Sequence, residues 1–213
     1  RHPVEDLREG ARFVFHHPML RPVFATQFVF NTAFFVLLAV FVPYAIRSLD
    51  LSASAVGVIL GTYGVGMVVG ALLAGRIIRL LPFGIVVAIG PIAGLTAAFV
   101  MVLTISIPSP LLAGLSFFLL GIGPIVWVIS TTTLRQTVTP PDLLGRVSAI
   151  NIMAYGARPI GAGIGAFVGG YFGAELCLVV VAFGFFVQAV MILMSPVVRL
   201  AHLPEMVDYP TRA

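Results

Sequence analysis

One arginine interrupts an apolar, glycine-rich stretch of the chain, AINIMAYGARPIGAGIGAFVGG at residues 149–170, where Arg158 lies near the middle. A guanidinium group stays charged at any physiological pH, and a charge at the centre of a bilayer costs about 2.5–3.5 kcal/mol on insertion scales. Residues of this kind usually face a cavity or the interior of a helix bundle. We therefore expect Arg158 to face a water-accessible gap instead of lipid.

Other polar side chains also fall within apolar segments of the sequence. Ser148, Asn151, Tyr155 and Arg158 follow one another by three, four and three residues, which places them on one face of a helix. We expect one substrate pathway, lined by Arg158, Tyr155, Asn151, Gln27, Asn31, Tyr63 and Trp127. Hydrogen bonding between helices is the alternative for each uncharged member, and we assign Gln188 to packing.

No acid accompanies Arg158 in the apolar segments. All eight carboxylates fall in predicted tails or loops: Glu5, Asp6, Glu9, Asp50, Asp142, Glu175, Glu205 and Asp208. The counter-charge must therefore come from an anionic substrate, from backbone carbonyls or from a carboxylate outside this chain. For the same reason, these segments supply no buried acid that could carry a proton.

The inventory of reactive groups argues against an enzyme. The four histidines lie in the tails, and the single Cys177 excludes an internal disulfide and a zinc cluster. GLSFF at 114–118 lacks the G-x-S-x-G pattern, and GAGIGA at 161–166 lacks the preceding strand that a dinucleotide fingerprint requires. We expect no catalytic residue, no metal and no cofactor.

Composition sets the fold class. The chain of 213 residues is 60% hydrophobic and 9% charged, with a mean hydropathy of +1.11. Soluble domains carry about a quarter charged residues, so lipid must cover much of this surface. All twelve basic residues are arginine, and we interpret the net charge of +4 as a topology signal, with no nucleic-acid partner.

Charge-free runs divide the chain into membrane spans of roughly 20 residues or more. We predict six: 22–46, 51–75, 83–106, 111–133, 147–174 and 176–198. The expected fold is an all-α membrane protein whose six transmembrane helices, within residues 21–199, form one bundle. Residues 1–20 form a linker segment that contains an amphipathic helix at 4–17, and residues 200–213 form a tail.

Arginine placement predicts the orientation of this bundle. Arg47 stands alone on one side, and ten arginines lie on the side of the termini: Arg1, Arg8, Arg12, Arg21, Arg76, Arg79, Arg135, Arg146, Arg199 and Arg212. We expect a multi-pass protein of the inner (plasma) membrane with both termini, and hence the linker segment and the tail, in the cytoplasm.

Two predicted cytoplasmic loops carry candidate gating residues. The loop 70–82 contains Gly70, Arg76 and Arg79, and the loop 134–150 contains Asp142, Gly145 and Arg146. Asp142 and Arg146 are spaced i,i+4 with the acid first, so we expect an ion pair that latches one conformation. The alternative interpretation is topology charge with a surface cap. Four-residue glycine spacings at 57/61, 66/70 and 161/165/169 mark close helix packing, either static or sliding.

Several stretches resemble the major facilitator superfamily: EGARFVFHHPMLRPVF, LRQTVTPPDLLGRVSAI and ARPIGAGIGA. The chain is similar to the C-terminal six-helix half of exporters that include the enterobactin exporter and macrolide and multidrug efflux proteins. Gly70, Arg76 and Arg79 fit the superfamily signature G-x-x-x-D-R-x-G-R-R, whereas Gly75 and Ile78 depart from it. The resemblance implies a partner, an N-terminal six-helix half in the same full-length chain or in a separate subunit; a homodimer of halves is the less favoured arrangement.

The resemblance implies proton-coupled export of small amphipathic molecules, such as siderophores or drugs, by alternating access across the bilayer. The alternatives are a six-helix membrane channel and a membrane scaffold that does not transport. A channel requires a polar pore face on several helices, and polar residues here are sparse.

Overall fold

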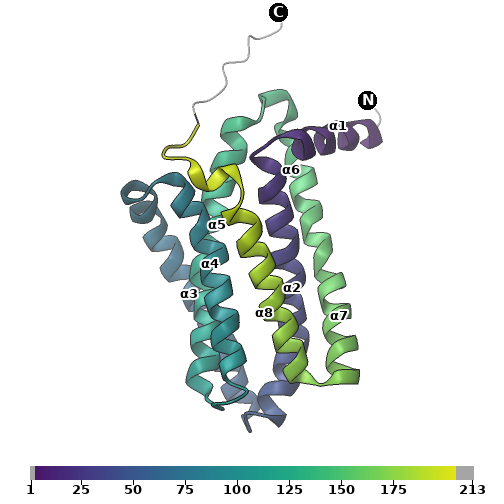
Figure 1. Ribbon diagram of the computed structural model, residues 1–213, viewed down its shortest axis with the longest axis vertical. Helices are drawn as coiled ribbons and strands as arrows, with labels where there is room; N and C mark the ends of the chain where they lie inside the picture. Colours follow the sequence, from purple (N-terminus) through teal and green to yellow (C-terminus); the bar gives the residue numbers. More distant parts are fainter. Residues whose placement is uncertain (1–2, 205–213) are drawn as a thin grey trace, which may run out of the picture.

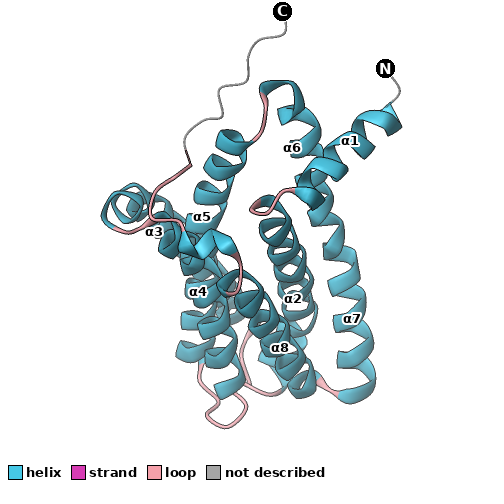
Figure 2. Cartoon of the chain, turned by 45° about the horizontal axis from the view of Figure 1, so that its top comes forward, coloured by secondary structure: helices cyan, strands magenta, loops and turns pink. Residues whose placement is uncertain are grey.

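The computed structural model describes residues 3–204, and every secondary-structure element in that range is a helix (Figures 1 and 2). The α-helices are α1 (Pro3–His16), α2 (Leu20–Arg47), α3 (Ala53–Leu80), α4 (Phe83–Leu103), α5 (Pro110–Val138), α6 (Leu144–Met153), α7 (Ala157–Phe172) and α8 (Ala174–Leu193). Three short 3₁₀ segments complete the order: η1 (Pro141–Leu143), η2 (Ala154–Gly156) and η3 (Pro196–Arg199). Arg1, His2 and the predicted tail from residue 205 lie outside the described residues.

Five of the described helices, α2, α3, α4, α5 and α8, are long and apolar enough to cross a membrane. The predicted fifth span, 147–174, is not one uninterrupted α-helix, because η2 separates α6 from α7. Pro159 explains the break, since it has no N–H to donate to the carbonyl of Tyr155 four residues earlier. Gly173, with a φ of 92°, then links α7 directly to α8 in a conformation that favours glycine.

The long helices pack in a fixed order of neighbours. Helix α3 packs on α5, α5 on α4, α4 on α8, α8 on α2, and α2 on α7. Exchanging α2, α3 and α4 with α5, α7 and α8, respectively, reproduces the same set of pairs. Because consecutive helices alternate in direction, the two triplets run in opposite senses (Figure 1). The bundle therefore consists of two inverted repeats that share one core.

Two hydrophobic clusters fill the two ends of the bundle. The cluster far from α1 includes Phe41 and Phe117, whose ring centroids are 4.5 Å apart. In the same region the hydroxyl oxygens of Tyr44 and Thr104 lie 2.8 Å apart in a buried hydrogen bond. The cluster near α1 contains Val87, Leu134 and other buried aliphatic residues. Space remains between the clusters.

Glycines set the distance between several helix pairs. A Cβ on Gly66 would overlap the carbonyl oxygen of Phe118 on α5, and one on Gly161 would overlap that of Thr32 on α2. Helices can approach this closely only where a side chain is absent. Part of the predicted glycine pattern has a different environment, because no atom lies within 4 Å of a Cβ built on Gly57, Gly61 or Gly64.

Helix α1 crosses the end of the bundle and packs against α6 (Figure 2). The joint with α2 is held by His17, whose Nδ1 accepts hydrogen bonds from the N–H groups of Met19 at 3.2 Å and Leu20 at 3.4 Å. Partial burial lowers the pKa of His17, which favours the neutral ring that this acceptor role requires. The N–H groups of Met19 and Leu20 at the start of α2 are thereby satisfied.

The boundaries of the predicted loops and tail need correction. Helix α3 continues to Leu80 and ends just before Pro82, and α5 continues to Val138 and ends just before Pro140. Gly70, Arg76, Arg79 and Arg135 are therefore helical. Charge-free runs mark where the apolar surface ends, whereas the backbone hydrogen bonds of a helix continue beyond that point.

Part of the predicted tail belongs to the bundle. The carbonyls of Leu200 and Ala201 accept hydrogen bonds from the N–H groups of Gly84 at 2.8 Å and Phe83 at 3.2 Å. Pro82, which precedes α4, has no side-chain cap, so the chain after α8 supplies the missing acceptors.

Candidate functional site

A cavity of about 300 Å³ lies between the two hydrophobic clusters. Its volume is at the lower end of the range of small-molecule sites. Helices α2, α3, α4, α5, α7 and α8 all contribute to its wall, together with η2. The lining residues are Gln27, Phe30, Asn31, Phe34, Phe35, Tyr63, Met67, Gly90, Pro91, Gly121, Pro124, Ile125, Trp127, Val128, Tyr155, Arg158 and Gln188.

Arg158 is held by three neighbours in this cavity. Its Nε donates a hydrogen bond of 3.2 Å to Oδ1 of Asn31. The guanidinium carbon lies 4.3 Å from the ring centroid of Tyr155 and 5.3 Å from that of Phe35, so the charge sits over two aromatic faces. Tyr155 and Arg158 are also exposed at the surface of the bundle, so the cavity opens along the start of α7.

The side chain of Asn31 is itself fixed. Its Nδ2 donates a hydrogen bond of 2.8 Å to the carbonyl of Gln27 one turn earlier on α2. Oδ1 is therefore available to accept from Arg158. The i,i+4 spacing that the sequence shows at Gln27 and Asn31 thus serves to position an acceptor for the arginine.

Glycine and proline shape the wall that α4 and α5 contribute. A Cβ on Gly90 would lie only 2.5 Å from Cβ of Trp127, so α4 can pack on this tryptophan only with glycine there. Pro91 and Pro124 lie inside their helices, where each removes one backbone hydrogen bond. The cavity therefore lies where both helices are locally weakened.

The structure brings six of the seven predicted pathway residues together. Gln27, Asn31, Tyr63, Trp127, Tyr155 and Arg158 all line the cavity. Asn151 does not; it lines a second, much smaller cavity of about 10 Å³ nearer to α1. The 3₁₀ turns of η2 lie between Asn151 and Arg158 and rotate the two side chains out of the shared face that a continuous α-helix predicts.

Sequence reasoning missed two residues near this path. Gln188, which the sequence analysis assigns to packing, is buried but also borders the cavity, and its Nε2 has no hydrogen-bond partner among the described residues. Arg135 was counted as a topology charge, but it lines the small cavity beside Thr131 and Asn151. The spacing of Trp127, Thr131 and Arg135 by four residues is the signal that could have placed Arg135 on the cavity face of α5.

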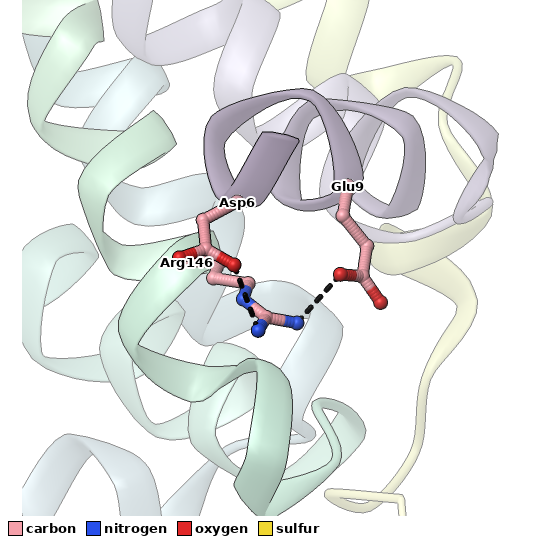
Figure 3. A network of polar contacts seen from close by, with 3 residues as sticks. All are labelled: Asp6, Glu9 and Arg146. Atoms are coloured by element: carbon pink, nitrogen blue, oxygen red, sulfur yellow. Dashed lines mark hydrogen bonds and ion pairs between the residues drawn. The ribbon is translucent and has the colours of Figure 1, made fainter. Parts of the chain in front are cut away.

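An ionic cluster links α1 to α6 at the end of the bundle that α1 crosses (Figure 3). The Nη2 of Arg146 lies 2.8 Å from Oδ1 of Asp6, and its Nη1 donates to Oε2 of Glu9 at 2.6 Å. Gly10 allows this contact, since a Cβ there would lie 2.8 Å from the backbone carbonyl oxygen of Arg146.

The predicted ion pair of Asp142 and Arg146 is not formed in this structure within the described residues. Asp142 is exposed in η1 and forms no ion pair within residues 3–204. Because η1 is a 3₁₀ segment that precedes α6, the two residues do not share one α-helical face at i,i+4 spacing.

The other candidate gating residues occupy two environments. Gly70 packs against Ile122 of α5, so it serves helix packing inside α3. Arg76 and Arg79 are exposed at the end of α3, and Nε of Arg79 donates to the carbonyl of Gly75 at 3.1 Å. Gly145 is exposed in α6, with no atom within 4 Å of the Cβ position.

Comparison with known proteins gives one family match. The sequence model of a major facilitator superfamily family, described as transmembrane secretion effector, matches residues 3–208. No curated protein matches the chain.

Proposed function

The chain belongs to this transmembrane secretion effector family, since the match spans nearly all of it, and on that premise we propose that it exports small amphipathic molecules by alternating access. Family membership and the apolar helices make it a multi-pass membrane protein of a transporter family. Transport direction, substrate class and mechanism are the proposal.

The observation that carries the proposal is the cavity. Its wall combines aromatic rings, such as Phe34, Tyr63 and Trp127, with the charged group of Arg158. A wall of this kind suits a molecule with a large apolar body and a small polar group. A channel would need a continuous polar path, whereas the cluster around Phe41 and Phe117 fills the bundle beyond the cavity.

A second six-helix bundle completes the site in this proposal. Tyr155 and Arg158 lie at the open side of the cavity, where a facing bundle would cover them. In this proposal the protein lies in the plasma membrane, and the end of the bundle that carries α1 and α6 faces the cytoplasm. The excess of arginine at that end supports this orientation. Transport is coupled to protons, and the second bundle supplies the proton carrier.

The gating element of the proposal is the group of charged residues at the cytoplasmic end. Arg76 and Arg79 on α3 and Asp142, Gly145 and Arg146 around α6 lie at this end of the bundle. The contact of α1 with α6 holds this end in one arrangement, and release of that contact accompanies the change of access.

A transport measurement tests the proposal. Arg158→Gln removes the charge and keeps a polar side chain, and we expect it to lower transport at least about ten-fold, since it deletes the charged group in the cavity. The assay is uptake into energised inside-out vesicles of three probes: a catecholate siderophore, a macrolide and a bis-benzimide dye.

The matched control is Arg199→Gln, which removes the same charge at an exposed position in η3. Membrane abundance of each variant is measured by immunoblot. Normal uptake by Arg158→Gln would remove the arginine from the mechanism, and absence of uptake of every probe by the unmodified protein would count against export.

A further inference from the structure

We propose that the cavity selects acidic molecules: an aromatic or apolar body that carries a carboxylate, sulfonate or phenolate group. This assignment rests on the proposed transport function and names the charge of its substrate. Arg158 binds the acidic group, and Arg135 provides a second contact closer to α1, on the same path.

The guanidinium of Arg158 has N–H groups that are not used in hydrogen bonds within the described residues. Its Nε is used by Asn31, and no ion pair or hydrogen bond of the two Nη groups occurs within residues 3–204. The guanidinium carbon lies 4.3 Å from the ring centroid of Tyr155 and 5.3 Å from that of Phe35, and an acidic group can use the Nη donors. Bidentate binding of a carboxylate is the geometry to which a guanidinium is suited.

Gln188 borders the cavity without presenting its amide nitrogen to it. The residue is 1% exposed, and its Nε2 is buried without a partner among the described residues. A buried donor left without an acceptor costs about 1–3 kcal/mol. The binding of the acidic group is therefore assigned to Arg158 alone.

The wall of the cavity contains no carboxylate. The acids of the described chain lie at the ends of the bundle: Glu5, Asp6, Glu9, Asp50, Asp142 and Glu175. A cavity with one cation and no anion attracts anions and repels cations, because the low dielectric of the bundle weakens the screening of its charge.

Arg135 extends this positive path toward the cytoplasmic end. It lies two turns beyond Trp127 on α5 and lines the small cavity together with Asn151, which precedes Tyr155 by one turn on the facing segment. Its Nε is buried without a partner in the described part of the chain. The small cavity holds at most about one water molecule, so an anion reaches Arg135 only when α6 moves away from α5.

A charge-matched set of probes tests the assignment. The probes share a bromonaphthalene body and differ in one group: 6-bromonaphthalene-2-sulfonate, the corresponding methylammonium and the neutral methanol. The purified protein in lipid nanodiscs is titrated with each probe, and quenching of Trp127 by the bromine reports contact inside the cavity. The signal from Trp127 is the part that disappears in Trp127→Phe.

We expect the sulfonate to bind at least about ten-fold more tightly than the ammonium and the neutral probe. Arg158→Gln abolishes this preference, and Arg158→Lys keeps part of it. Arg135→Gln leaves equilibrium binding in the cavity within about three-fold but lowers vesicle uptake of the sulfonate relative to the neutral probe. Arg199→Gln changes neither measurement.

Three results would overturn the assignment. The first is equal binding of the three probes, which would show that Arg158 does not select the charge of the bound molecule. The second is an unchanged anion preference in Arg158→Gln, and the third is quenching of Trp127 by none of the probes. The vesicle assay judges the transport function separately, since uptake of cationic or neutral compounds would support export while the charge assignment fails.

Discussion

At the scale of single residues, Arg158 illustrates how a charge is retained in an apolar bundle. Its hydrogen bond to Asn31 and its position over Tyr155 replace part of the hydration that a guanidinium loses. Cation–π contacts contribute about 0.5–1 kcal/mol at exposed positions such as this one, less than the cost of about 2.5–3.5 kcal/mol that a charge has on insertion scales. The two contacts therefore offset only part of that cost, and the Nη groups remain available for binding.

Gly161 and Gly163 form a matched pair for a residue-scale prediction. A Cβ on Gly161 would overlap the carbonyl oxygen of Thr32 and lie 3.1 Å from Cβ of Phe35, whereas a Cβ on Gly163 meets no atom within 4 Å. We expect Gly161→Ala to lower the free energy of unfolding by about 1–3 kcal/mol, because α7 must move away from α2.

The measurement is equilibrium unfolding in mixed micelles, followed by helical circular dichroism. Gly163→Ala is the control, and it should leave stability unchanged or raise it by up to about 1 kcal/mol, since alanine favours a helix over glycine. Equal destabilisation by the two substitutions would show that close approach of α2 and α7 is not what Gly161 provides.

Sequence analysis located most of the polar residues of the cavity, but not all of them. Gln27, Asn31, Tyr63, Trp127, Tyr155 and Arg158 are identifiable because polar groups at membrane depth are rare. Asn151 was misplaced because the sequence does not reveal that η2 changes the helical register. Gln188 and Arg135 were seen but assigned to packing and topology, since burial and cavity geometry are properties of the folded bundle.

At the scale of secondary-structure elements, the contact of α1 with α6 replaces the predicted latch. Arg146 is paired across two elements, to Asp6 and Glu9, and its side chain is 17% exposed. Local i,i+4 spacing predicted a partner within the same loop, but the acids of α1 lie closer because Gly10 lets the two helices touch.

We expect Arg146→Gln, or the pair Asp6→Asn with Glu9→Gln, to loosen α1. Each exposed ion pair contributes about 0.2–1 kcal/mol, so hydrogen exchange of the amides of residues 5–16 should accelerate about two- to ten-fold. The change should be smaller at high salt, which screens the pairs in the unmodified protein.

Hydrogen exchange with mass spectrometry provides the measurement. Glu5→Gln, on the same helix but without an ion pair in the described chain, is the matched control, and Asp142→Asn should also have no effect on α1. Acceleration by Asp142→Asn equal to that by Arg146→Gln would restore the originally predicted latch.

The positions of the helices were predictable because charge-free runs of apolar residues report the thickness of the membrane. Five of the six predicted spans overlap α2, α3, α4, α5 and α8, which are long and apolar enough to cross a membrane, and the predicted span 147–174 overlaps the α6–η2–α7 segment. Their ends were less predictable, since helix ends follow prolines such as Pro82 and Pro140 instead of the first charge. The sequence pattern also does not predict which helices pack against each other, because that depends on which glycine of one helix faces which carbonyl of another.

At the scale of the whole molecule, α3 and α7 are the outermost helices in the order of packing α3, α5, α4, α8, α2, α7. Both carry glycines against which no other part of the described chain packs. Gly57, Gly61 and Gly64 on α3 and Gly163 and Gly170 on α7 have no atom within 4 Å of the Cβ position. Exposed glycine weakens a helix and contributes no packing of its own, so its presence on two exposed surfaces favours close contact with further helices. Both helices also line the cavity, through Tyr63 and Arg158.

The proposed second bundle should therefore depend on this surface. We expect Gly61→Trp to reduce its association several-fold, because an indole prevents close approach of a facing backbone. The affinity-tagged chain is co-expressed with an untagged partner, either a six-helix N-terminal half from a protein of this family or a second copy of this chain, and recovery of the partner is quantified.

Ile92→Trp on α4 is the control, since Ile92 is also exposed but lies on a helix packed between α5 and α8. Recovery of the N-terminal half would indicate a transporter of two different halves, and recovery of the second copy would indicate a homodimer. In both cases the glycine surface is required, because the facing helices must reach α3 and α7 to enclose Arg158. Association that survives Gly61→Trp but is lost in Ile92→Trp would place the second bundle on the opposite face, where it would leave the cavity open to lipid and the export mechanism without an enclosed site.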